Sequence, residues 1–255
     1  MEKIELLKKL IAHLDETCPK DNESYKYIGT GNPNANILII GKEAAHEPGT
    51  TAFNHEIMPN FNYWKSEQVF NQENVSSIHE KYVYSPLYPY KGQVLKIDNC
   101  KNFGTSRTWY NYQKIYNLIT GNDNNQQINF HEGVFITEVN STPSKKTYNA
   151  NTESIEYRKK CFLTSEFIGS FPIVIIGGVR YFEINDTKNE IEDIFNVKFE
   201  TQKFAAGNKK QPYWIHWNND KTKLLINTYQ LSMGISDALL KEIVDVIKES
   251  NLLGK

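Results

Sequence analysis

Four short runs of branched apolar residues constrain the fold of this chain more than any other feature of its sequence. They cover Ala35–Ile40, Val134–Val139, Phe171–Ile176 and Lys223–Ile226. A short apolar run that polar or glycine residues close is typical of a strand buried on both faces of a sheet. Helical patterns separate the runs, which predicts parallel strands joined by covering helices. We therefore expect an α/β fold: a three-layer α/β/α sandwich around a central four-stranded, mainly parallel sheet.

Apolar spacing also places the helices. The first sixteen residues carry leucine and isoleucine on one face, as an amphipathic helix does. A second helix is expected over Ser106–Ile119, with Gly121 as its C-cap, and a third from an N-cap at Thr152 through Ile168. The last helix should follow Ser236, because a stripe from Leu239 to Ile247 can pack on the sheet.

No repeat, low-complexity tract or linker divides the 255 residues, so we expect a single domain over 1–255. A long irregular insertion is expected at about 50–105.

Aromatic residues make up 13% of the chain, and 13 of the 32 aromatic residues lie between Phe53 and Tyr112. Some of these rings must be core, and the others could wall a pocket for a planar ligand. Trp214 and Trp217 fit a sheet surface or core edge better than a base-stacking platform.

Composition argues against several classes of protein. The longest apolar runs are far shorter than the roughly 18–20 residues that a membrane helix needs, and the charged N-terminus lacks the features of a secretory signal. We expect a cytoplasmic protein without a membrane span. The net charge of −1 disfavours a protein that coats nucleic acid. The cysteines are isolated and the histidines lack metal-ligand spacing, so we expect no disulfide framework, no metal and no cofactor.

Polar loops follow the carboxyl ends of all four runs, where open parallel sheets form their ligand crevice. The loops are Gly41–Gly49, Glu138–Pro143, Gly177–Arg180 and Asn227–Ser232. Glycine allows sharp turns and close approach of a ligand, and Asn, Gln and Glu supply the hydrogen-bonding groups that recognise the edge of a heterocycle. These loops are therefore the expected site.

The motifs of common nucleotide-binding and hydrolase folds are absent. No P-loop or Gly-x-Gly-x-x-Gly follows the first strand, because Gly29-Thr30-Gly31 precedes it. A Gly-x-Ser-x-Gly nucleophile elbow is also missing, which argues against an α/β-hydrolase.

The four loops, in this order, resemble those of the uracil-DNA glycosylase superfamily. The first motif would be Ile37–Gly49, with Glu43 two residues after Gly41, where the family commonly has a water-positioning Asp or Asn. Phe53 follows at about the distance of the family's base-stacking aromatic residue. The second motif, Phe135–Asn140, is similar to the family's strand that ends in a base-recognising Asn. The resemblance implies the small parallel sheet between helices that this superfamily has.

The resemblance also implies roles for individual residues. Glu43 would position the attacking water, and Asn227 could donate a neutral hydrogen bond to the leaving base. The flipped base would be bound by Gly41, Phe53, Glu138 and Asn140. Phosphates of the DNA would be contacted by Lys145, Lys146 and Arg180.

Departures from the family pattern leave the activity open. Ala44 stands where the family usually has Pro, and the loop after the fourth run lacks the family's histidine, which polarises the developing charge on the leaving base.

Three interpretations of the function follow. One is a DNA base-excision N-glycosylase that acts on a flipped base. Another is a catalytically inactive nucleobase- or nucleic-acid-binding module of the same fold. An unrelated flavodoxin-like enzyme is a third, against which the missing phosphate-binding motifs argue. In the first two, the partner is DNA or a nucleobase-containing ligand.

Overall fold

The computed structural model describes residues 2–19, 23–44, 49–50, 53–66, 85–89, 106–123, 125–144, 150–178, 180–232 and 234–254. The strands are β1 (Thr30–Gly31), β2 (Ile37–Gly41), β3 (Val134–Glu138), β4 (Ile173–Ile176), β5 (Ile184–Asn185), β6 (Lys188–Asn189), β7 (Lys198–Ala205), β8 (Asn208–Trp217) and β9 (Leu224–Thr228). The α-helices are α1 (Lys3–Thr17), α2 (Asn60–Lys65), α3 (Arg107–Thr120), α4 (Thr152–Tyr157), α5 (Glu166–Gly169), α6 (Glu190–Phe195) and α7 (Asp237–Glu249). Single turns of 3-10 or π geometry are η1 (Glu23–Lys26), η2 (Phe53–Ile57), η4 (Phe130–Glu132) and η6 (Arg158–Phe162).

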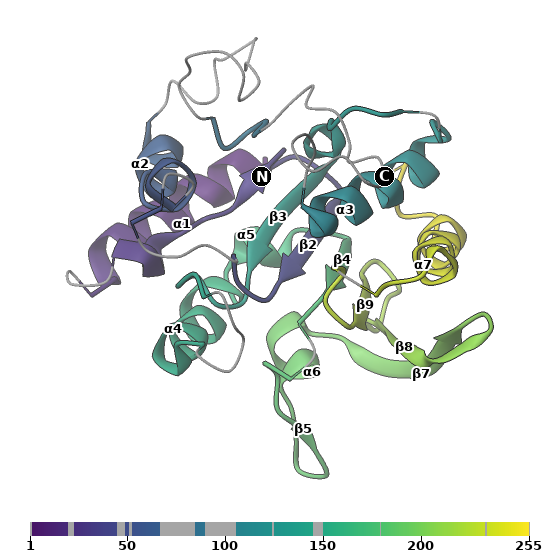
Figure 1. Ribbon diagram of the computed structural model, residues 1–255. Helices are drawn as coiled ribbons and strands as arrows, with labels where there is room; N and C mark the ends of the chain where they lie inside the picture. Colours follow the sequence, from purple (N-terminus) through teal and green to yellow (C-terminus); the bar gives the residue numbers. More distant parts are fainter. Residues whose placement is uncertain are drawn as a thin grey trace.

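The four apolar runs form the parallel centre of one sheet, as predicted. The strand order is β1-β3-β2-β4-β9-β8-β7, and the four central strands β3, β2, β4 and β9 are parallel (Figure 1). Ile37 lies opposite Val134 on one side and Ile173 on the other, so the strands are in register and their carboxyl ends are level. The fold is therefore mixed α/β with a mainly parallel central sheet.

The expectation of four strands was wrong, because the described part of this sheet has seven. β1 pairs with β3, and β8 and β7 extend the other edge as an antiparallel hairpin. β7 is mostly exposed, so it lacks the continuous apolar run by which the central strands are found. Trp214 and Trp217 lie in β8 and are half-buried, and Trp217 packs against the core, as the sequence predicted.

Helices cover both faces of the sheet. Leu38 and Ile40 enter an apolar cluster with α1, α2, α4, α5 and α6, whereas Ile37 and Ile39 enter a second cluster with α3 and α7. This alternation follows from the period of two along a strand. Figure 1 shows α1 and α2 on one side of the central strands and α3 and α7 on the other.

The helix boundaries follow local capping chemistry. Ser106 accepts a hydrogen bond from the backbone N–H of Trp109, Gly121 closes α3 in the left-handed conformation, and Ser236 accepts one from Leu239 N–H at the start of α7. The first, second and last expected helices are thus confirmed, with α3 and α7 capped as their sequences indicate.

The expected helix from Thr152 to Ile168 is instead broken into three parts. Asn151, rather than Thr152, caps α4 with its side chain, and the chain then widens into the π-helical turn η6. There the N–H of Leu163 donates to the carbonyl of Arg158, a spacing of five residues. Ser165 caps the separate helix α5. The predicted helix therefore ends at η6, and Ser165 begins a new one.

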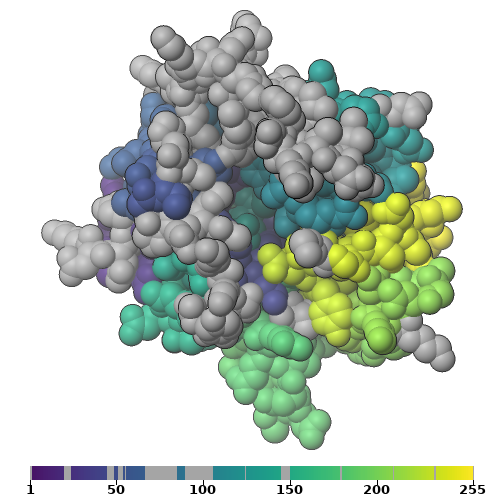
Figure 2. Space-filling model, viewed as in Figure 1, coloured from purple at the N-terminus to yellow at the C-terminus, as the bar shows by residue number. Residues whose placement is uncertain are grey.

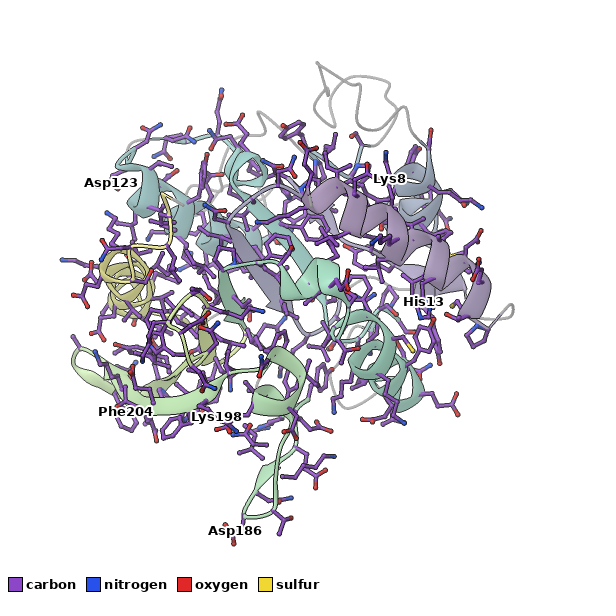
Figure 3. The ribbon with its side chains drawn as sticks, turned by 180° about the vertical axis from the view of Figure 1, so that it is seen from behind. Lys8, His13, Asp123, Asp186, Lys198 and Phe204 are labelled. Carbon is purple, nitrogen blue, oxygen red and sulfur yellow. The ribbon has the colours of Figure 1, made fainter. Side chains whose placement is uncertain are left out.

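A small hairpin projects from the body of the protein. It consists of β5 and β6, and Figure 2 shows it extending from the lower edge of the molecule. Figure 3 places Asp186 at its tip, and Lys198 and Phe204 along the outer strand β7. Ile184 of the hairpin is 54% exposed. None of the described helices is long and apolar enough to cross a membrane.

Candidate active site

A cleft of about 280 Å³ opens where the central strands end. Its walls come from the residues after β2, the last residue of β3, the loop after β9, the turn η2 and the beginning of α3. The described lining includes three carboxyl groups and three large aromatic side chains: Glu43, Glu56, Glu138, Tyr27, Trp109 and Tyr112. Two other hollows, between α3 and α7 and between α1 and α2, lie away from the strand ends. The cleft thus occupies the usual ligand position of an open parallel sheet.

Gly41 and Glu138 meet at the bottom of this cleft. They lie opposite each other at the ends of β2 and β3. The carboxyl group of Glu138 folds over Gly41 so closely that a Cβ atom at residue 41 would overlap Oε2. That oxygen is buried, and none of the described residues forms a hydrogen bond with it. Glycine is therefore needed at residue 41 to leave room for the carboxyl group.

The environment of Glu138 favours its protonated form. Burial raises the pKa of its carboxyl group to about 8, the charge of Glu43 raises it further, and the guanidinium of Arg158 opposes both. At neutral pH the group is mostly protonated and can donate a hydrogen bond as well as accept one.

Glu43 supplies the second carboxyl group, and a tyrosine helps to position it. Its side chain is buried, and the hydroxyl of Tyr181 donates a hydrogen bond to Oε2. Tyr181 follows β4, and the ammonium group of Lys42 lies 5.7 Å from the centre of its ring. Residues at the ends of two neighbouring strands thus fix the position of Glu43.

Arg158 supports the site from beneath. Its side chain is completely buried, in η6, and its guanidinium donates to the carbonyls of Tyr27 and Glu138 and to the hydroxyl of Thr137. The group also lies 3.5 Å from the ring centre of Phe162. Burial lowers its pKa to about 9, which leaves it charged at neutral pH. Arg158 therefore fixes the end of β3 and the backbone on either side of the cleft.

Aromatic side chains form much of the remaining wall. Burial raises the pKa values of Tyr27 and Tyr112, so both phenols stay protonated and can donate hydrogen bonds. The indole of Trp109 packs edge-on against Phe130 and His131. Burial lowers the pKa of His131 to about 3, so this neighbour of the wall carries no charge at neutral pH.

The structure brings together only some of the residues predicted from sequence. Gly41, Glu43 and Glu138 line one cleft. Asn140 and Asn227 are buried, but neither is among the described residues of the lining. Asn140 Oδ1 accepts from the N–H of Thr142, and its Nδ2 has no hydrogen-bond partner in the part of the chain that the structure describes. Asn227 lies inside the sheet near the end of β9, and its Oδ1 accepts no hydrogen bond from the described residues.

The other predicted residues are only partly described. Lys145 and Lys146 lie outside the described residues, as does the side chain of Phe53, whose backbone begins η2. Arg180 is exposed. Burial lowers the pKa of Lys42, and the positive charge of Arg180 lowers it further, against the opposing charge of Glu43. Arg180 therefore lies near the residue between Gly41 and Glu43, at the edge of the site.

Sequence reasoning missed several members of the site. Tyr27 and Glu56 come from irregular segments in which no motif marks them. Trp109 and Tyr112 lie within the helix that the sequence predicts over Ser106–Ile119, and only the tertiary fold shows that they reach the cleft. Arg158 had a usable signal, because it lies three residues after Ile155 and four before Phe162, which places it on the apolar face.

The described residues include no group of three or more His, Cys, Asp or Glu side chains that could hold a metal ion. Comparison with protein-family models, curated proteins and solved structures finds no significant match to the chain. The site's own geometry therefore carries the functional argument.

Proposed function

We propose that this chain is a DNA N-glycosylase with a uracil-DNA-glycosylase-like fold, which hydrolyses the bond between an extruded base and its deoxyribose. The observation that carries the proposal is the pair of carboxyl groups, Glu43 and Glu138, in one aromatic-walled cleft at the strand ends. A volume of about 280 Å³ is close to the lower end of ligand pockets, roughly 300 Å³, which suits one base.

The two carboxyl groups would have different roles. Glu43, held by Tyr181, would orient a water molecule toward C1′ of the sugar and accept its proton. Glu138, protonated at neutral pH, would donate to and accept from the edge of the base. Stacking on the aromatic wall would add about 1–3 kcal/mol and help to offset the cost of extruding the base.

Contacts with DNA phosphates would come from the edge of the cleft. Lys42 and Arg180 lie near each other beside the first strand-end loop, and Lys145 and Lys146 stay predicted members of the same surface. A few such contacts fit a chain whose net charge is −1, because only the DNA around one extruded base has to be held.

The activity can be tested with duplexes that contain uracil, hypoxanthine or an alkylated purine, with alkali-labile abasic sites as the readout. We expect strand cleavage after alkali with at least one of them, and a rate about 100-fold lower for Glu43→Gln. Glu249→Gln is the matched control. Glu249 is exposed in the last turn of α7, whereas the strand-end loop Asn227–Ser232 leads into the first turn of this helix. An absence of abasic sites with every duplex, or an unchanged rate for Glu43→Gln, would contradict the proposal.

The second candidate is a nucleobase-binding module without catalysis. It is favoured by the position of Asn227, the expected hydrogen-bond donor to the leaving base, which the described lining of the cleft does not include. In that case the protein would retard base-modified DNA in a salt-dependent manner without producing abasic sites.

A further inference from the structure

The described lining of the cleft carries acidic groups and no basic ones. It contains the carboxyl groups of Glu43, Glu56 and Glu138 and no lysine, arginine or histidine. Glu138 is mostly protonated in the empty cleft at neutral pH, and a bound cation would favour its ionised form. The nearby imidazole of His131 is neutral and lies behind Trp109. Such a lining disfavours a ligand that carries or develops negative charge, and it favours a cation, because charges interact strongly where water is partly excluded.

The aromatic wall has the same preference. Trp109, Tyr112 and Tyr27 line the cleft together with the carboxylates. The faces of indole and phenol rings carry partial negative charge and attract cations, by about 0.5–2 kcal/mol for each contact. A flat cationic ring could therefore use both the stacking surface and the charge of this wall.

Glu138 provides an oxygen that no described group of the protein satisfies. Its Oε2 is buried over Gly41 without a hydrogen-bond partner among the described residues, although Arg158 donates to the backbone carbonyl of the same residue. A buried acceptor without a partner is costly, and a ligand that brings a donor or a positive charge to it removes that cost.

From these three features we infer that the cleft takes a planar, positively charged nucleobase, of the class produced when a ring nitrogen of a purine is alkylated. The inference about excision rests on the proposed glycosylase function, whereas the inference about ligand charge rests on the lining alone.

A cationic base also suits the chemistry that this lining can perform. The oxygen of water forms a bond to C1′ while the bond from C1′ to the ring nitrogen breaks. The electron pair of the broken bond returns to the base and neutralises its positive charge, and the proton of the water passes to the carboxylate of Glu43. The products are a neutral alkylated base and an abasic sugar. No group is needed to stabilise a negatively charged leaving base, and the described lining has no cation for that purpose.

The charge preference can be measured without DNA. The probes are 1-methylnicotinamide, a planar ring with a permanent positive charge, and nicotinamide, its neutral counterpart, titrated calorimetrically into the full-length protein at pH 7.5. We expect the cation to bind at least tenfold more tightly. Glu138→Gln and Glu56→Gln should each reduce this ratio at least threefold, whereas Glu249→Gln should retain it, with thermal melting to show that each variant is folded. Equal or weaker binding of the cation would overturn the inference.

An excision assay then tests the inference about ligand charge and the proposed glycosylase function independently of each other. Duplexes with 7-methylguanine or 3-methyladenine are compared with duplexes that contain uracil or hypoxanthine. Faster excision of the alkylated bases, after correction for their spontaneous loss, supports both the cationic ligand class and the glycosylase function. Faster excision of uracil or hypoxanthine overturns the cationic class and leaves the glycosylase proposal intact. Preferential binding of the cation with no excision of any base overturns the glycosylase function and supports the ligand class.

Discussion

The carboxyl group of Glu138 occupies the space that a side chain at residue 41 would need, because Gly41 and Glu138 lie opposite each other at the ends of two parallel strands. The glycine that closes β2 is thus part of the site as well as the end of a strand. The absence of a Cβ at residue 41 allows the buried carboxyl group to fold into the cleft.

Gly41→Ala tests this relationship. The new methyl group would overlap only the end of the Glu138 side chain, which can rotate away, so we expect unfolding free energy to fall by no more than about 1–3 kcal/mol. Excision or ligand binding should fall at least tenfold, because Glu138 leaves its position. Chemical denaturation and the abasic-site assay measure the two effects. Gly169→Ala is the control, since nothing lies within 4 Å of its added Cβ, and it should stabilise α5 by about 0.4–1 kcal/mol. A Gly41→Ala protein with normal activity would contradict the proposed role.

Arg158→Met should destabilise the protein strongly. The methionine keeps much of the volume but removes the donors to the carbonyls of Tyr27 and Glu138 and to the hydroxyl of Thr137. Each buried acceptor left without a partner costs about 1–3 kcal/mol. We expect urea denaturation to show a loss of at least about 2 kcal/mol. Arg107→Met, at an exposed position in α3, should change the stability by less than about 0.5 kcal/mol, and an equal effect of both variants would contradict this account.

The centre of the fold could be predicted because burial on both faces of the sheet leaves continuous apolar runs. Ile37–Gly41 and Ile173–Ile176 are examples. The polar loops that follow such runs predict a site at the strand ends, which is where the cleft opens. The β7–β8 hairpin could not be found in this way. The eight residues of β7 are largely exposed, so hydrophobic burial imposes no period on them.

The walls of the site depend on packing between distant segments. Gly41, Glu43 and Glu138 were predictable, since all three follow or end neighbouring strands. Trp109 reaches the cleft because α3 packs across the sheet. Its spacing along the helix shows that it faces the protein, but does not show whether it lies in the core or in the wall of a cleft. Arg158 was missed for a different reason: a charged residue is normally solvated even where its spacing places it on the apolar face, and here it is fully buried in η6.

Tyr181→Phe should separate the positioning of Glu43 from protein stability. The change removes the hydroxyl that donates to Glu43 and keeps the ring, so the unfolding free energy should fall by only about 1 kcal/mol. Because this contact helps to orient the Glu43 carboxyl group, we expect the excision rate to fall about tenfold with little change in substrate affinity. Single-turnover kinetics measure both quantities. Tyr229→Phe, at an exposed ring, should retain the wild-type rate, and a Tyr181→Phe rate equal to it would contradict the assigned role.

The raised pKa of Glu138 makes stability depend on pH in a defined direction. Its pKa is raised from 4.5 to about 8 in the folded protein. Between these values the folded state holds a proton that the unfolded chain has released, so unfolding free energy falls as pH rises, by up to about 1.4 kcal/mol per pH unit. Two charged groups act on this carboxyl group: Glu43 raises its pKa and Arg158 lowers it. In turn, the charge of Glu138 raises the pKa values of Tyr27 and Tyr112.

Glu138→Gln has no proton to lose, so the difference in unfolding free energy between this variant and the wild type should shift in favour of the variant from pH 5 to pH 8. Above about pH 8 the difference should level off, because the wild-type carboxyl group is then ionised in both states. Urea denaturation at half-unit steps of pH measures the difference, and Glu249→Gln provides the control for an exposed carboxyl group. A constant difference between pH 5 and pH 8 would show that Glu138 titrates at the same pH in the folded and unfolded chain.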